Sequence, residues 1–257
     1  MSHSMRQQLV QARRFDIHNC ANQIASLVSE KMIASPDSIS SVTYTYDGDC
    51  LEVTQGKNTY SIGKRLTGDF FDTFPGIEIE IRSEIKEKPD IDGYYYHTLD
   101  KNTDDGLIEV IAYLDNDFLK NVKYDYLKRA IQSILVHEMQ HVVQRCYSKI
   151  DMAQTHNTSI DHLNDVREID ARVEEVLCGI DDVSNVRMFT SKMTSYLHDY
   201  CKRNNMIGID IAKSVQTHVD FYCEKILSNS QQSSNMQNKT ASCTQMPYCV
   251  KVASIIV

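Results

Sequence analysis

The feature that most constrains this chain is the run His137-Glu138-Met139-Gln140-His141, which has the form H-E-x-x-H. On an α-helix, residues four positions apart lie on the same face, so His137 and His141 can present two imidazoles to one ion. Zinc hydrolysis uses two neutral nitrogen ligands and a neighbouring carboxylate that takes a proton from the zinc-bound water without binding the metal. The motif therefore predicts a Zn2+ site with His137 and His141 as ligands and Glu138 as general base.

The residues around the motif predict a buried helix over residues 124–147. Apolar side chains recur at helical spacing, and no Pro or Gly interrupts residues 107–178. The apolar stripe consists of Ile131, Leu135, Val136, Met139, Val142 and Val143. A narrow polar side consists of Ser133, Gln140 and Gln144.

A catalytic zinc site needs a third protein ligand. The extended pattern with a third histidine is excluded, since Gln144 stands at its Gly position and Tyr147 at its final His position. The remaining candidates lie downstream and are His156, Asp161, His162, Asp165, Glu168, Asp170, Glu174 and Glu175.

Glu168 is the preferred third ligand because it lies on a strongly helical segment and has a small residue, Ala171, three positions later. A small side chain there lets this helix approach the motif helix closely. Asp165 and His162 remain alternatives. Asp170 and Arg172 are candidates for orienting a ligand histidine through its other ring nitrogen, although surface charge is the simpler role for both.

An H-E-x-x-H motif followed by a helical E-x-x-A segment, Glu168 to Ala171, resembles the gluzincin group of zinc metallopeptidases. The resemblance covers roughly residues 107–178, and the spacing between the two segments is closer to that of small, divergent gluzincin-like peptidases of bacteria and phages. It implies a two-His, one-Glu zinc site. A peptidase also needs a donor for the oxyanion of the tetrahedral intermediate, and the candidates near the returning segment are Tyr147, His156 and His162.

The order of expected elements predicts an α+β fold: an N-terminal helix and a mostly antiparallel sheet, then a central active-site helix and a helical C-terminal half. A helix is expected over residues 5–34, ended by Ser35-Pro36. Strands are expected at 42–46, 50–54, 59–62, 77–81, 94–97 and 107–114, and helices at 162–178, 186–200 and 211–226.

The chain is expected to form one zincin-like domain over residues 1–227, with helix and sheet in 1–122 and helices with the metal site in 123–227. Residues 228–246 are polar and are expected to form a flexible linker, followed by an apolar tail at 247–257.

Composition excludes some classes of partner. The net charge of -8 argues against nucleic-acid binding, which needs a basic face. The N-terminus has no apolar segment of a signal peptide, and no run reaches the roughly 18 apolar residues of a membrane span. We therefore expect a cytoplasmic protein with reduced cysteines, or a virion protein if a phage encodes it.

Two functions follow from the sequence. The first is a single-zinc peptidase acting on a peptide or protein substrate, with strand 107–114 bordering the cleft and pairing with an extended peptide. Residues 94–97, three tyrosines and a histidine, are expected to be a strand and could also line the cleft. The alternative is a zinc-stabilised structural or interaction protein, for example a virion component, that keeps the zincin fold without turnover.

Overall fold

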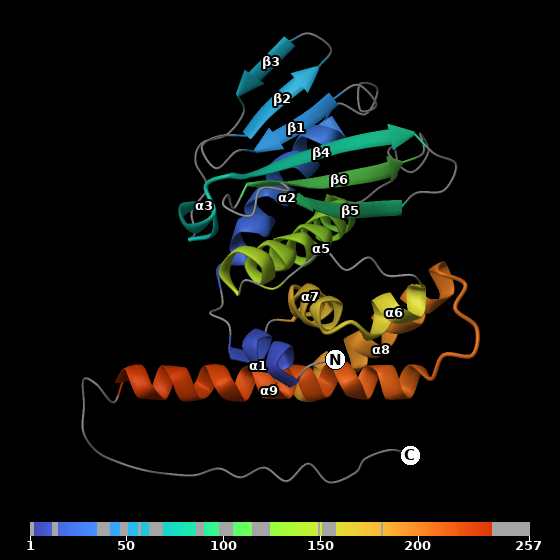
Figure 1. Ribbon diagram of the computed structural model, residues 1–257. Helices are drawn as coiled ribbons and strands as arrows, with labels where there is room; N and C mark the ends of the chain where they lie inside the picture. Colours follow the sequence, from blue (N-terminus) through green and yellow to red (C-terminus); the bar gives the residue numbers. More distant parts are fainter. Residues whose placement is uncertain are drawn as a thin grey trace.

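A computed structural model gives the fold over residues 3–11, 15–34, 42–46, 51–55, 58–61, 69–85, 90–97, 105–114, 124–148, 150, 158–180 and 182–237. Figure 1 shows the sheet at the top, α5 beneath it, α7 next, and the long helix α9 along the base. The metal-site motif therefore lies in the middle of the molecule, between a sheet layer and a helical layer.

The sheet has six strands in the order β3-β2-β1-β4-β6-β5. Their bounds are β1 Val42–Tyr46, β2 Leu51–Gln55, β3 Asn58–Ser61, β4 Ile77–Ile85, β5 Asp90–His97 and β6 Gly106–Leu114. Four neighbouring pairs are antiparallel, and β4 and β6 are parallel. The prediction of a mostly antiparallel sheet in an α+β protein is confirmed. The expected turn at Asp47-Gly48 lies outside the described residues.

One face of the sheet is covered by helices, and the other carries exposed and partly exposed side chains among the described residues. Ile77, Ile79 and Ile81 are fully buried, whereas Glu78 is exposed and Arg82 retains 38% exposure in its side chain. This alternation follows from the two-residue period of a strand. Helix α2 (Ile17–Ala34) and helix α5 (Tyr124–Val142) cover the buried face, and with the short helix α3 (Phe70–Thr73) they complete one hydrophobic core.

The N-terminal segment forms two helices and not the one expected over residues 5–34. Helix α1 (His3–Gln11) ends before α2, and the Asp16 side chain accepts a hydrogen bond from the Asn19 amide at the start of α2. Acidic residues at such a position favour the beginning of a new helix. Leu9 and Val10 belong to a second core, so a single straight helix would not serve both cores.

The second core is almost entirely helical, and Ile150 and Ile180 are its buried members outside helices. It is formed by α1, α6 (Ser159–Asn164), α7 (Val166–Leu177), α8 (Val186–Arg203) and α9 (Ile211–Gln237). Its centre includes Phe189, Met193, Phe221 and Tyr222, with the Phe189 and Tyr222 rings stacked at a centroid distance of 4.0 Å. The helical C-terminal half is thus confirmed. The boundary expected near residue 122 does not divide the cores, because α1 packs in the second and α5 in the first.

Helix α9 also corrects the linker prediction. The polar run that begins at residue 228 continues as helix to Gln237, so the expected flexible linker is wrong over residues 228–237. A helix already anchored by buried side chains such as Phe221 and Tyr222 can propagate one residue at a time into polar sequence. The rest of the linker and the apolar tail lie outside the described residues. Of the described helices, none combines the length and the apolar character needed to cross a membrane.

Candidate metal centre

Helix α5 presents its apolar side to the sheet and its motif side to α7. All six residues of the expected apolar stripe are buried, so the stripe fixes which way the motif points. The helix then widens into a π-helical turn, Val143–Tyr147. Such turns are frequent at functional sites because they redirect side chains. Here Gln144, expected on a polar side, is fully buried and reaches the motif.

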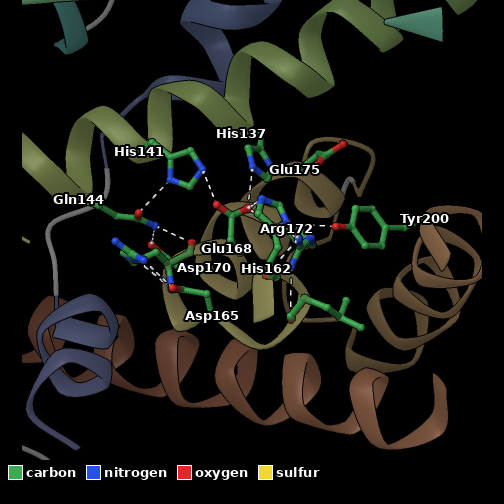
Figure 2. Close-up of polar contacts among 12 residues, drawn as sticks. His137, His141, Gln144, His162, Asp165, Glu168, Asp170, Arg172, Glu175 and Tyr200 are labelled. Carbon is green, nitrogen blue, oxygen red and sulfur yellow. Dashed lines mark hydrogen bonds and ion pairs between the residues drawn. The ribbon is translucent and has the colours of Figure 1, made fainter. Parts of the chain in front are cut away.

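Helix α7 brings Glu168 to the two motif histidines (Figure 2). Nε2 of His137 is 3.4 Å from Oε2 of Glu168, and Nε2 of His141 is 3.3 Å from Oε1. One ligand atom from each residue lies within 4.8 Å of the other two, which makes this a group that could hold a metal ion. Ala171 is fully buried, in keeping with the close approach expected of α7. The three predicted ligands therefore meet.

The donor set fits a tetrahedral ion. Each histidine nitrogen lies 3.3–3.4 Å from a different oxygen of Glu168, which is close to the separation of about 3.3–3.4 Å between two zinc ligands, and two imidazoles with one carboxylate are a donor set that zinc accepts. In addition, Oε2 of Glu168 is buried without a hydrogen-bond partner among the described residues, although ion-pair partners lie near it. A buried carboxylate oxygen in that state is suited to a cation.

Both histidines are held through their outer nitrogens. Nδ1 of His137 is 3.0 Å from Oε2 of Glu175, and Nδ1 of His141 is 3.0 Å from Oε1 of Gln144. Because a carboxylate and an amide oxygen only accept, each Nδ1 donates, so in the neutral form that binds a metal each imidazole has its lone pair on Nε2, facing Glu168. Outer partners of this kind fix the tautomer of metal-binding histidines.

Glu175 is itself anchored. Ser133 donates to Oε1 at 2.8 Å, and the Tyr196 hydroxyl donates to Oε2 at 2.8 Å. Gln144 donates to the carbonyl of Arg167 at 2.8 Å and to Oδ2 of Asp170 at 2.9 Å. The outer partners of both histidines are therefore fixed in turn by α5, α7 and α8.

The charges of the site are strongly coupled. Burial disfavours a charged imidazole, but Glu168 and Glu175 outweigh it and raise the pKa of His137 to about 10. Burial alone would raise the pKa of Glu168, yet His141 and His137 hold it well below its usual range. Burial raises the pKa of Glu138, with His137 and His141 opposing the rise. Without a metal ion, protons on the histidines supply the positive charge that Glu168 needs.

Glu138 lies beside the histidines and packs against Gly93, in the middle of β5. A side chain at Gly93 would place its Cβ 3.1 Å from Cγ of Glu138 and 2.2 Å from Ile134, so the strand approaches the helix closely only because residue 93 is glycine. Glu138 is 7% exposed and lines the same cavity as His137, His141 and Glu168. Its carboxylate is thus at the site without belonging to the ligand group.

A cavity of about 650 Å³ opens over the candidate metal centre. One wall is β5, and the other consists of side chains from α7 and α8. The lining beyond the motif and Glu168 comprises Ile91, Asp92, Gly93, Tyr94, Tyr95, Tyr96, Ile134, His162, Arg167, Arg172, Glu175, Tyr196, Tyr200, Arg203 and Asn204. The tyrosines of residues 94–96 both form a strand and line the cavity.

The strand expected to border the cleft is the wrong one. β6, which contains residues 107–114, is paired on both sides, with β4 and β5. β5 is therefore the edge strand of the sheet and the one that faces the cavity, with no further neighbour among the described strands. The order of the strands along the chain does not predict which of them lies at the edge. In the sheet, β6 pairs with β4 on one side and with β5 on the other, so β5 lies between β6 and the cavity.

The remaining candidates for a metal ligand or an oxyanion donor lie in different places. His162 comes to the site, with Nε2 3.2 Å from Oε2 of Glu168, but is not in the metal-binding group. Tyr147, one of the three candidates for an oxyanion donor, does not line the cavity: its half-exposed ring packs edge-on against Phe15. His156 lies outside the described residues. Asp165 caps α7 and pairs with Arg167 at 2.6 Å, which removes it as a ligand.

Three further ligand candidates have structural partners. Asp161 receives a hydrogen bond from Thr158 at the start of α6. Asp170 and Glu174 lie on another side of α7, where Lys225 of α9 contacts both. Asp170 also accepts from Gln140 at 2.6 Å, and Glu174 lies 2.8 Å from His18 of α2. These groups tie the two cores together and leave the cavity to Glu168 and Glu175.

Tyr196 and Tyr200 are site residues that the sequence did not predict. Both come from α8, whose helical stripe gave no reason to separate them from ordinary packing residues.

Comparison of the chain with protein-family models, curated proteins and solved structures found no match. The class of this site is therefore argued from its own geometry.

Proposed function

We propose that this protein is a zinc-dependent metallopeptidase. The observation that carries the proposal is the convergence of His137, His141 and Glu168, with both Nε2 atoms facing the carboxylate while Glu175 and Gln144 hold both Nδ1 atoms. When bound, zinc supplies a Lewis acid that polarises a carbonyl and makes water acidic near neutral pH.

The chain's own residues supply the remaining chemistry. Glu138 accepts a proton from the attacking water and returns it to the leaving amine, a role suited by its position on the cavity wall and by a pKa raised through burial. His162 lies on the other side of Glu168 from His137 and His141, and its Nε2–H donates a hydrogen bond to the oxyanion that develops on the substrate. The edge of β5 that has no neighbour among the described strands binds an extended peptide as an added strand, so the substrate is a peptide or protein segment.

Replacing Glu138 by Gln tests this function. The amide keeps the shape of the side chain and leaves all three ligands, so about one zinc per chain is expected to remain while turnover of a peptide library falls by about 10²–10⁴-fold. Full activity in the Glu138→Gln protein contradicts the proposal.

The same assay tests the alternative of a zinc-stabilised structural protein. A peptidase loses activity when a chelator removes zinc and regains it when zinc returns. A structural site loses thermal stability on chelation and has no turnover to lose.

A further inference from the structure

His162 is held by contacts that its own helix does not provide. It lies near the end of α6, a helix of six residues, and its side chain is 36% exposed. Its ring stacks on Tyr200 at a centroid distance of 6.3 Å, and the Tyr200 hydroxyl is 3.0 Å from Nδ1. The closest contact is with Arg172, whose Nη2 lies 2.7 Å from Nδ1.

Arg172 is placed to act on His162. It is 1% exposed, its guanidinium lies 4.8 Å from the centre of the Tyr200 ring, and its Nη1 reaches the carbonyls of His162 and Leu163 at 3.4 Å. One buried guanidinium thus contacts both the main chain and the ring of His162, as Figure 2 shows for the ring. A planar fork with several donors can do this, whereas a point charge cannot.

The direction of that contact determines the tautomer. A guanidinium only donates, so Nδ1 of His162 has to accept. A neutral imidazole whose Nδ1 accepts carries its proton on Nε2, the atom that lies 3.2 Å from Glu168 at the candidate metal centre. An Nε2–H there is a hydrogen-bond donor and not a metal ligand, which accounts for the place of His162 next to the ligand group and outside it.

We infer that Arg172 is a positioning residue, which fixes the His162 ring in its Nε2–H form and so aims a donor at the oxyanion of the substrate. This rests on the proposed peptidase function. Arg172 itself does not touch the reacting atoms, although its Nη2 also lies 3.6 Å from Oε2 of Glu168. Turnover is therefore compared per bound zinc, and on that basis the effect of Arg172 passes through His162.

Nitrogen NMR of the zinc-loaded full chain, labelled in histidine, reads the tautomer without a substrate. His162 signals are identified by their loss in His162→Gln. Wild type is expected to show a protonated Nε2 and a bare Nδ1, Tyr200→Phe the same pattern, and Arg172→Met a mixture of tautomers. A proton on Nδ1 in wild type, or an unchanged pattern in Arg172→Met, overturns the inference.

Turnover tests the coupling of the two residues. His162→Ala is expected to lower kcat by about 10²–10³-fold, as for loss of an oxyanion donor, and Arg172→Met by about 10–100-fold. The double variant should equal His162→Ala, because Arg172 acts through His162. Additive losses overturn the inference, because they mean that Arg172 acts independently of His162, for example through its ion pair with Glu168.

Arg172→Lys provides a second test of the inference if the Arg172→Met protein does not fold. Lysine keeps the buried charge but cannot hold the ring and both carbonyls at once, so a second tautomer and lower kcat are expected. Wild-type spectra and wild-type kcat together in Arg172→Lys overturn the inference. Absence of any turnover in zinc-loaded wild type would instead refute the peptidase function, while the wild-type spectrum still decides the tautomer.

Discussion

Two faces of α7 carry buried charge, and they differ in how completely that charge is paired. Glu168, Arg172 and Glu175 follow each other at i, i+4 and i+7 and face the cavity, whereas Asp170 and Glu174 lie on another face toward α2 and α9. Both oxygens of Asp170 and both of Glu174 have partners. On the cavity face, Oε2 of Glu168 and Nε of Arg172 are buried without hydrogen bonds among the described residues, and Oε2 has only longer ion-pair contacts, at 3.2–3.6 Å.

The difference indicates a structural role for the fully paired face and supports the proposed metal centre on the other. Buried charge stabilises a fold only when its partners are complete, and the Asp170–Glu174–Lys225 cluster meets that condition. The cavity face leaves a carboxylate oxygen for a cation. The two faces are joined by Gln144, which contacts both His141 and Asp170.

The largest expected effect is on the structural face. Asp170→Ala leaves Lys225 with one carboxylate in place of two and removes the acceptor of Gln140 and Gln144. Breaking a buried charge cluster costs about 3–5 kcal/mol, which denaturant unfolding of the metal-free protein measures. The exposed Asp199→Ala on α8 is the control, with a change within about 0.5 kcal/mol. Equal free energies of unfolding for the two variants would contradict the structural role of the Asp170–Glu174–Lys225 cluster.

The next effect is the pH dependence of zinc binding. In the metal-free protein the pKa of His137 is raised from 6.5 to about 10, so its contribution to stability is complete below pH 6.5 and is lost as pH rises toward 10. Zinc needs the unprotonated Nε2, so its binding releases a proton and strengthens with pH by about tenfold per unit for one proton.

Thermal unfolding with and without zinc at pH 6 and pH 8 measures this dependence. The increase in Tm caused by zinc should be larger at pH 8, and the Glu168→Ala control should show no increase at either pH. A larger increase at pH 6 would mean that the histidines are not the ligands.

A smaller effect is expected at the outer partner of His137. Glu175→Gln keeps an acceptor for Ser133 or Tyr196. It removes the negative charge that orients the His137 imidazole and raises its basicity as a ligand. Zinc affinity should fall by about 10–100-fold, measured by competition with a chromophoric chelator. Glu224→Gln, in the exposed ion pair with Arg6, is the matched control and should bind zinc as wild type does. Identical affinities would remove Glu175 from the site.

The sequence could predict what depends on helical period. His137, Glu138 and His141 share a face because of i, i+4 spacing, and Glu168 was singled out by Ala171 on its own helix; the structure brings all three expected ligands together. The expected strands 42–46, 50–54, 59–62 and 107–114 came within one residue of β1, β2, β3 and β6, because each carries alternation or an apolar run beside turn residues. The expected strands 77–81 and 94–97 cover only about half of β4 and β5.

The rest depends on tertiary contacts that leave no local pattern. The position of β5 at the sheet edge follows from the parallel pairing of β4 with β6, and the π-helical turn that brings Gln144 to His141 lies inside an uninterrupted helical pattern. Tyr147 was a candidate oxyanion donor because it lies near the segment that returns to the motif, but its ring packs against Phe15. The roles of Tyr196 and Tyr200 arise only when α8 packs on α7.

The most direct test is zinc content, measured by elemental analysis of protein purified without an affinity metal column. Wild type should carry about one zinc per chain, Glu168→Ala should carry almost none, and a Glu224→Gln control should match wild type. Wild type that neither carries nor takes up zinc, or a Glu168→Ala protein that retains it, would contradict a metal centre formed by His137, His141 and Glu168.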